Sequence, residues 1–162
     1  MKKAAALSVT VLLIFMCSCS KAETPQSICV NSVFTSKAEI HYNETAYTAD
    51  FTSNENGCSA VFLLPECLKG FEIAVIGEEI TYSLGSLSFT SQITPEQTLP
   101  VQAIYQAIKA TPETVTENEK GYTLCGRTKY GNYVMNIDGK TLTPAFIEYE
   151  EKEITVNFGY SA

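Results

Sequence analysis

The chain has 162 residues, of which 45% are hydrophobic, and its 18 acidic residues outnumber its 11 basic residues to give a net charge of −7. This length is enough for one domain with a core of its own and too short for two domains of ordinary size. The negative charge repels phosphate groups, which makes nucleic acid and anionic lipid headgroups poor partners.

The N-terminus has the features of a bacterial export signal that ends at a lipidation site. A short basic segment, Met1-Lys2-Lys3, precedes an apolar stretch from Ala4 to Met16. This stretch is shorter than the about 20 residues of a membrane-spanning helix, which is typical of a signal peptide. It ends in the sequence MCSCS, which resembles the bacterial lipobox, with Cys19 as the residue that receives the lipid.

This resemblance implies a signal peptide over residues 1–18 and a diacylglycerol thioether on Cys19. Two acyl chains anchor a protein stably, at about 0.8 kcal/mol per buried CH₂. The protein is then expected outside the cytoplasm, attached to the bacterial cell membrane, or to the outer membrane if the cell has one. Removal of Lys2 and Lys3 with the signal leaves 9 basic and 18 acidic residues, a net charge of −9. The alternative is cleavage after Ser20 or Ala22, which gives a freely secreted protein.

Residues 19–33 are rich in Ser, Thr, Pro, Gln and Lys and show little periodicity. They are predicted to form a flexible tether between the lipid and a single domain at 34–162, with a reach of roughly 20 Å.

Alternation of apolar and polar residues dominates the remaining sequence and predicts about ten short strands. Short turn signals separate them, and Asn56-Gly57 is the strongest, because an Asn-Gly pair is typical of a type I′ turn with positive φ at both residues. The predicted strands lie at residues 39–42, 47–52, 58–64, 71–75, 80–84, 87–89, 122–128, 133–137, 145–149 and 154–160.

One segment has a different period. Val101, Ile104, Tyr105 and Ile108 form a single apolar stripe at helical spacing, so a helix is predicted from Leu99 to Ala110. Residues 112–120 are predicted to be an acidic loop. Short connections between alternating strands favour an antiparallel meander. The expected fold is therefore mainly β (α+β), a strongly curved antiparallel sheet forming an open half-barrel, with one amphipathic helix packed on its concave face.

The sequence does not favour an enzyme. Cys67, in the segment FLLPECLKGFEI, is the first candidate for a nucleophile, but a reactive thiol usually needs a cationic neighbour or a helix N-terminus. Lys69 is a cation near Cys67 in the sequence, but Glu66 is adjacent to Cys67 and its charge acts in the opposite direction. His41 is the only histidine, at a polar position of the first strand. Neither a nucleophile elbow nor a phosphate-binding glycine loop is present, and no cofactor is expected.

No metal site is expected either, because the domain lacks a Cys-x-x-Cys pair. Its glutamates at 148–153 are expected on the outward face of one strand and beside a turn, as a solvated hairpin, and Asp138-Gly139 is expected to be a turn. Four cysteines follow the lipobox, and an exported protein could oxidise them. Cys58 and Cys67 lie too far apart along an extended strand to be bridged. The remaining options are Cys29–Cys67 with Cys58–Cys125, Cys29–Cys58 with Cys67–Cys125, or four free thiols.

Several segments together resemble small bacterial lipoproteins of the lipoprotein-carrier (LolA/LolB-like) superfamily, over about Phe34 to Tyr160. They are the lipobox, the hairpin AEIHYNETAYTADFT, then VFLLPECLKGFEI, ITYSLGSLSF, the helix led by Pro100, and the closing YVMNIDGKTLTPAFIEYEEKEITVNF. The resemblance implies a half-barrel whose concave apolar face holds acyl chains. The soluble carrier of the superfamily uses a gating arginine, and Arg127 is the only arginine in this chain.

The expected function is that of a membrane-anchored lipoprotein with an apolar cavity that binds or carries a lipid or another acyl-containing ligand. It rests on an excess of inward-facing aromatic residues over what one helix can cover. The alternative is a cell-surface structural or protein-interaction module with a filled core and no ligand. The residues expected to line the cavity are Tyr47, Phe51, Phe62, Phe71, Ile73, Tyr82, Phe89, Tyr105, Ile108, Tyr133 and Phe158.

Overall fold

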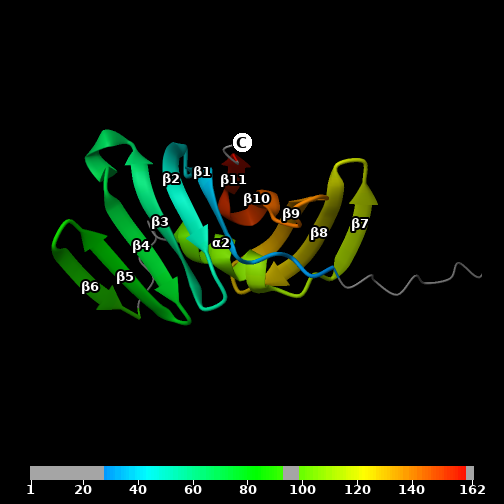
Figure 1. The fold of residues 1–162 in the computed structure, drawn as a ribbon, viewed down its shortest axis with the longest axis horizontal. Coiled ribbons are helices and arrows are strands. Elements are labelled where there is room, and N and C mark those ends of the chain that lie inside the picture. The colour runs from blue at the N-terminus through cyan, green and yellow to red at the C-terminus, as the bar shows by residue number, and fades with distance from the viewer. Residues whose placement is uncertain (1–27, 93–98, 160–162) are drawn as a thin grey trace, which may run out of the picture.

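The fold is one antiparallel β-sheet of eleven strands with a helix against one face (Figure 1). This computed structural model describes residues 28–92 and 99–159. The mainly β fold expected from the alternating sequence is confirmed. The strands in chain order are β1 (Phe34–Tyr42), β2 (Thr45–Ser53), β3 (Gly57–Leu64), β4 (Phe71–Ile76), β5 (Glu79–Leu84), β6 (Leu87–Ser91), β7 (Thr114–Asn118), β8 (Gly121–Thr128), β9 (Gly131–Asp138), β10 (Pro144–Tyr149) and β11 (Ile154–Gly159).

The sheet consists of two meanders joined at the centre. Its strand order is β6-β5-β4-β3-β2-β1-β11-β10-β9-β8-β7, so the first and last strands of the chain pair in the middle. Because β6 and β7 are the two edges, the sheet does not close on itself, and they lie at opposite ends of the molecule in Figure 1. Helix α2 (Leu99–Lys109) stands between β6 and β7 in the sequence and thus connects the edges.

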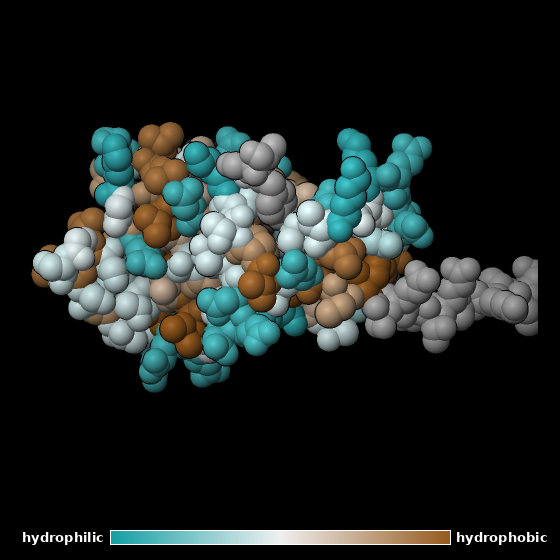
Figure 2. Space-filling model, viewed as in Figure 1, coloured by the Kyte–Doolittle hydropathy of each residue, from teal (hydrophilic) through white to brown (hydrophobic). Residues whose placement is uncertain are grey.

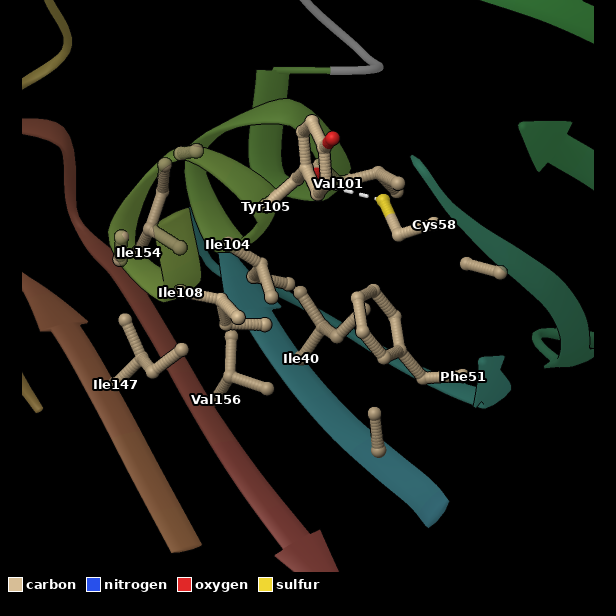
Figure 3. Packing of buried hydrophobic residues seen from close by; sticks show 14 of the residues in the cluster. Ile40, Phe51, Cys58, Val101, Ile104, Tyr105, Ile108, Ile147, Ile154 and Val156 are labelled. Carbon is tan, nitrogen blue, oxygen red and sulfur yellow. Dashed lines mark hydrogen bonds between the residues drawn. The ribbon is translucent and has the colours of Figure 1, made fainter. Parts of the chain in front are cut away.

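The core lies between α2 and the sheet. The predicted stripe of Val101, Ile104, Tyr105 and Ile108 is buried, as helical spacing requires. Figure 3 shows side chains of the helix directed toward the central strands, among them Ile104 and Ile108. The helix contacts β3 and β4 in one meander and β8 and β10 in the other, so it packs against both halves of the sheet.

The acidic segment after the helix is a strand, which corrects the predicted loop at 112–120. Residues of β7 pair with β8 in register from Thr114↔Cys125 to Asn118↔Gly121. Of the five residues of β7, only Val115 is half-buried and the others are exposed. An edge strand needs a partner on one side only, and backbone pairing can form it without apolar alternation. The sheet accordingly has one strand more than the ten predicted.

The type I′ turn forms at a different place from the one predicted. Asn43 and Glu44 have φ of 46° and 63° and join the paired residues Tyr42 and Thr45, which describes a two-residue I′ hairpin. The hairpin at Asn56-Gly57 exists, but its loop has four residues between the paired Ser53 and Cys58, and the prediction of a type I′ turn there is wrong.

Gly57 is required for a different reason. A Cβ on Gly57 would lie 2.1 Å from the backbone oxygen of Val75 on β4, so the glycine permits β3 and β4 to approach. The loop itself is ordered by Asn54, whose side-chain oxygen accepts hydrogen bonds of 2.9 Å from the backbone amides of Asn56 and Gly57.

The segment before β1 lies against the domain where it is described. The amide of Asn31 donates a hydrogen bond of 2.9 Å to the carbonyl of Leu142, and Val30 packs on the core. The predicted signal peptide, the lipidation site at Cys19 and tether residues 20–27 lie outside the described residues. In residues 28–92 and 99–159, no helix is long and apolar enough to cross a membrane.

Candidate functional site: an apolar cavity beside the helix

Five aromatic side chains form a ladder across five neighbouring strands, on the face that carries the helix. Ring centroids are 5.8 Å apart between the residues of β2 and β3, 6.3 Å between those of β3 and β4, 6.3 Å between those of β4 and β5, and 4.7 Å between those of β5 and β6. Stacked and edge-to-face pairs at such distances add about 0.5–1.5 kcal/mol each beyond the area they bury. The aromatic ladder consists, from β2 to β6, of Tyr47, Phe62, Phe71, Tyr82 and Phe89.

An apolar cavity of about 150 Å³ lies where this ladder meets the N-terminal end of α2. Among the described residues that line it, the hydroxyl of Tyr47 is the only polar side-chain group. Strands β1 to β4 provide its floor, the helix provides one wall, and Leu68 of the short 3-10 helix η1 (Glu66–Leu68) closes the end. The lining residues are Ile40, Tyr47, Phe62, Leu68, Phe71, Ile73, Pro100 and Val101.

The turn in FLLPECLKGFEI forms this closing wall. The strand β3 ends before Pro65, η1 follows, and Gly70 with φ of 79° returns the chain to β4. Leu68 is directed to the cavity, whereas Cys67 is exposed on the outside of the turn. An exposed ion pair of 3.2 Å joins Lys69 to Glu66, so the cation nearest in sequence is engaged with a carboxylate.

Polar contacts fix the first turns of α2 to both meanders. The hydroxyl of Tyr149 on β10 donates a 3.0 Å hydrogen bond to the carbonyl of Ala103, and the hydroxyl of Tyr130 donates one of 2.6 Å to Gln102. On the opposite side the thiol of Cys58 on β3 donates to the carbonyl of Val101 at 3.9 Å (Figure 3). The wall of the cavity that α2 provides is therefore held in place.

Burial raises the pKa of several groups beneath the helix. Desolvation raises the pKa of the Cys58 thiol, and it is the main cause of the raised pKa of Tyr105, to which Cys58 adds. Burial also raises the pKa of Tyr149 to about 12, although its hydrogen bond with Thr128 acts in the opposite direction. These groups are uncharged near neutral pH, as an apolar core requires.

The structure brings together four of the eleven candidate residues at the cavity: Tyr47, Phe62, Phe71 and Ile73. Tyr82 and Phe89 continue the aromatic ladder away from it. The other five lie in the core elsewhere. Phe51 and Phe158 pack on one another with ring centroids 5.6 Å apart, Tyr133 packs on Tyr149, and Tyr105 and Ile108 extend along α2.

Four residues around the cavity are absent from the sequence-based set: Ile40, Leu68, Pro100 and Val101. Val101 and Ile40 belong to apolar stripes, but no period in the sequence reveals which part of a stripe borders a cavity. Arg127 is exposed on β8 and alternates with the buried Leu124 and Gly126, so it does not line the cavity.

The remaining sites considered in the sequence are spread over the surface. His41 is exposed and lies 3.7 Å from the carboxylate of Glu39. Cys29, Cys58, Cys67 and Cys125 are free thiols. Within the described ranges, no group of three His, Cys, Asp or Glu residues could hold a metal ion.

No protein-family model matches the sequence. No curated protein matches it either. An uncharacterized conserved protein from Thermus thermophilus is a structural neighbour with 12% identity and a TM-score of 0.47, over 76% of this chain and 74% of that one. A LolA superfamily protein from Nitrosomonas europaea is another, with 9% identity and a TM-score of 0.42, over 82% of this chain and 87% of that one.

Proposed function

We propose that the protein is an extracytoplasmic lipoprotein that binds an apolar segment of a lipid, or of another acyl-containing molecule, in the cavity beside α2. Acylated Cys19 anchors it to the bacterial cell membrane. The observation that carries the ligand proposal is the cavity of about 150 Å³, whose lining in the described part of the chain consists of eight residues without a charged side chain.

The size of the cavity limits the ligand. A dry apolar cavity of about 150 Å³ takes a benzene-sized ligand, whereas pockets for drug-sized ligands occupy about 300–1,000 Å³. A whole acyl chain does not fit into the volume present. We therefore infer that the cavity receives the end of a chain, with the rest of the ligand outside.

The contacts of α2 support the half-barrel curvature that this proposal assumes. From β4 to β8 there are seven strand steps, about 33 Å along a flat sheet. An α-helix of 11 residues is about 16 Å long, yet it contacts both of these strands. Bending of the sheet toward the helix accounts for both contacts.

Ligand entry requires movement of the side chains at η1, where Leu68 closes the cavity. Leu68, Tyr47 and Phe71 are half-buried, whereas the residues at the helix side, Pro100 and Val101, are buried. The half-buried side chains can move without loss of the hydrogen bonds that hold α2. A ligand enters between the β1–β2 turn and η1, and the helix stays in place.

The substitution Leu68→Trp tests this function. The larger indole fills the entrance, and we expect the affinity for a fluorescent fatty acid to fall at least about tenfold, which corresponds to about 1.4 kcal/mol. The matched control is Leu63→Trp on the opposite face of β3, which should bind as the unchanged protein does. Because the chain contains no tryptophan, Leu68→Trp also introduces a single tryptophan at the cavity, whose fluorescence reports on ligand binding.

Two results contradict the proposal. The first is an unchanged protein that binds no fatty acid in this titration or in native mass spectrometry. The second is equal affinity in Leu68→Trp and Leu63→Trp, which places the ligand elsewhere.

One observation favours the second candidate function, a protein-interaction module without a ligand. Leu84, Leu87 and Phe89 are 52%, 73% and 63% exposed at one end of the sheet. Apolar residues gathered in this way often mark a protein contact. Absence of fatty-acid binding together with a stable protein complex would favour this function over the first.

A further inference from the structure

The edge strand β6 lacks the features that usually prevent strands from pairing between molecules. It contains neither a charged residue nor a proline, and its register with β5 is regular from Leu84↔Leu87 to Ile80↔Ser91. Natural edge strands are commonly protected by lysine, proline or a bulge. The opposite edge, β7, differs because it carries the exposed Glu117.

The apolar face of the β5–β6 hairpin extends the apolar face of the sheet to this edge. Leu84 and Leu87 lie opposite one another, and Phe89 lies opposite Tyr82 with ring centroids 4.7 Å apart. The aromatic ladder thus ends at a side chain that is 63% exposed. Figure 2 shows hydrophobic surface at the end of the molecule where β5 and β6 lie.

The opposite face of the hairpin is polar and uncharged. Hydroxyl groups face one another at 3.1 Å between Thr81 and Thr90, and at 3.3 Å between Ser83 and Ser88. Because a two-residue turn joins Leu84 and Leu87, these residues form a hydrogen-bonded pair of the ladder. The next pair, Ser83 and Ser88, is then a non-hydrogen-bonded pair, so the backbone N–H and C=O of Ser88 point away from β5.

We propose that β6 is an interface between two copies of this chain, which pair antiparallel with Ser88 opposite Ser88 of the second copy. In that register, Leu87 of each copy lies opposite Phe89 of the other, so the interface contains two aliphatic–aromatic cross-strand pairs. Such cross-strand pairs stabilise the pairing of neighbouring strands. The same patch serves both copies, as a two-fold axis requires.

The charge distribution favours a second copy at this edge despite the acidic chain. Glu79 of β5 lies beyond the Ile80↔Ser91 pair, so antiparallel pairing about Ser88 places the two Glu79 residues at opposite ends of the interface. Glu72 pairs with Ser83, which pairs with Ser88, so this glutamate lies two strands from the edge. In the dimer, the two Glu72 carboxylates would be separated by five strand steps, about 24 Å. This exceeds the Debye length of about 8 Å at physiological ionic strength, so their repulsion is screened.

The area fits a weak dimer. Pairing covers the backbone of β6 and much of the exposed surface of Leu84, Leu87 and Phe89 on each copy. This amounts to on the order of 1,000 Å² in total, the lower end of what a specific complex needs. The dimer is therefore expected to be concentration-dependent.

Photo-crosslinking of the full chain in intact cells tests this interface. A benzophenone-bearing phenylalanine analogue is placed at Leu87, and in a control at the exposed Thr116 of β7. The expected result is an adduct with twice the mass of the chain from position 87 and none from position 116. An adduct of position 87 with a different protein, or no adduct, overturns the proposal.

Charge variants distinguish the interface from a general effect on folding. Ser88→Lys places two lysines directly opposite one another, and we expect the adduct from position 87 to fall about fivefold or more. Thr116→Lys, the matched control, should leave it unchanged. Co-expression of Ser88→Lys with Ser88→Glu should restore the adduct between differently tagged copies, because the charges are then complementary. Failure of this restoration contradicts the proposed pairing.

Discussion

Tyr149 and Tyr133 are neighbouring buried tyrosines with different hydrogen bonding. Their ring centroids lie 6.0 Å apart, and both side chains are almost fully buried. The Tyr149 hydroxyl contacts the carbonyl of Ala103 and the hydroxyl of Thr128, each at 3.0 Å. The Tyr133 hydroxyl is buried without a hydrogen-bond partner within the described residues. The pair permits a comparison of a satisfied and an unsatisfied phenol in one core.

The Tyr133 ring lies against Gly126, which explains why this bulky residue fits there. A Cβ on Gly126 would lie 2.8 Å from the Tyr133 hydroxyl oxygen, so a larger residue would displace the ring. Desolvation is the largest cause of the raised pKa of Tyr133. Its hydroxyl thus carries the cost of burial without a compensating bond.

We expect Tyr149→Phe to lower the free energy of unfolding by about 1–2 kcal/mol, because it removes the hydrogen bond to Ala103 of α2 and the one with Thr128. We expect Tyr133→Phe to leave that free energy unchanged or to raise it by up to about 1 kcal/mol, because it removes an unsatisfied group. Urea unfolding of both variants at neutral pH measures the two changes. Equal destabilisation by the two substitutions would contradict this account.

At the scale of elements, the β1–β2 hairpin offers a test of local conformation. Glu44 occupies a position with φ of 63°, where a side chain is unfavourable and glycine is preferred. We expect Glu44→Gly to raise the free energy of unfolding by about 0.5–1 kcal/mol. Thermal or urea unfolding measures it.

Glu119→Gly is the control, in the β7–β8 turn. Glu119 is exposed and does not have positive φ, so glycine there only increases the freedom of the unfolded chain and should be slightly destabilising. If Glu44→Gly destabilises the protein as much as Glu119→Gly does, the left-handed turn at Asn43-Glu44 is incorrect.

The sequence predicts most elements because their signals are local. Ten strands and the helix follow from the period of apolar residues, which burial on one face imposes. The strand β7 could not be predicted in this way, since its single half-buried residue, Val115, creates no period. A turn at Asn43-Glu44 could be predicted from the sequence, but its type I′ form could not, because the strong Asn-Gly signal lies at residues 56–57, where glycine serves the contact with Val75.

The cavity could be predicted only in part, because it depends on the whole molecule. Alternation identifies inward aromatic residues, and four of the predicted residues do meet at one place. The sequence does not reveal that Leu68, in a turn, faces the same space as Val101 of the helix. That contact depends on the order of strands in the sheet, which brings the β3–β4 turn near the start of α2.

The proposed attachment to the membrane concerns the whole chain and can be tested separately from ligand binding. Cys19 and Cys17 both follow the apolar stretch, but lipidation of Cys17 would require cleavage after bulky Met16. We therefore expect Cys19→Ala to abolish metabolic labelling with an alkyne-bearing fatty acid and to release the protein from the membrane fraction. Cys17→Ala is the matched control and should remain labelled and membrane-bound.

The expected extent of release of Cys19→Ala from the membrane follows from the binding free energy of the proposed acyl chains. At about 0.8 kcal/mol per buried CH₂, the loss of both chains removes a membrane-binding free energy far larger than thermal energy, so release should be almost complete. Charge does not replace the anchor, because the net charge of −9 that remains after removal of residues 1–18 (9 basic and 18 acidic residues) repels an anionic membrane surface. Continued labelling of Cys19→Ala, or equal loss of label from Cys17→Ala, would show that this cysteine is not the attachment site, while the cavity beside α2 and its Leu68→Trp test would stand unchanged.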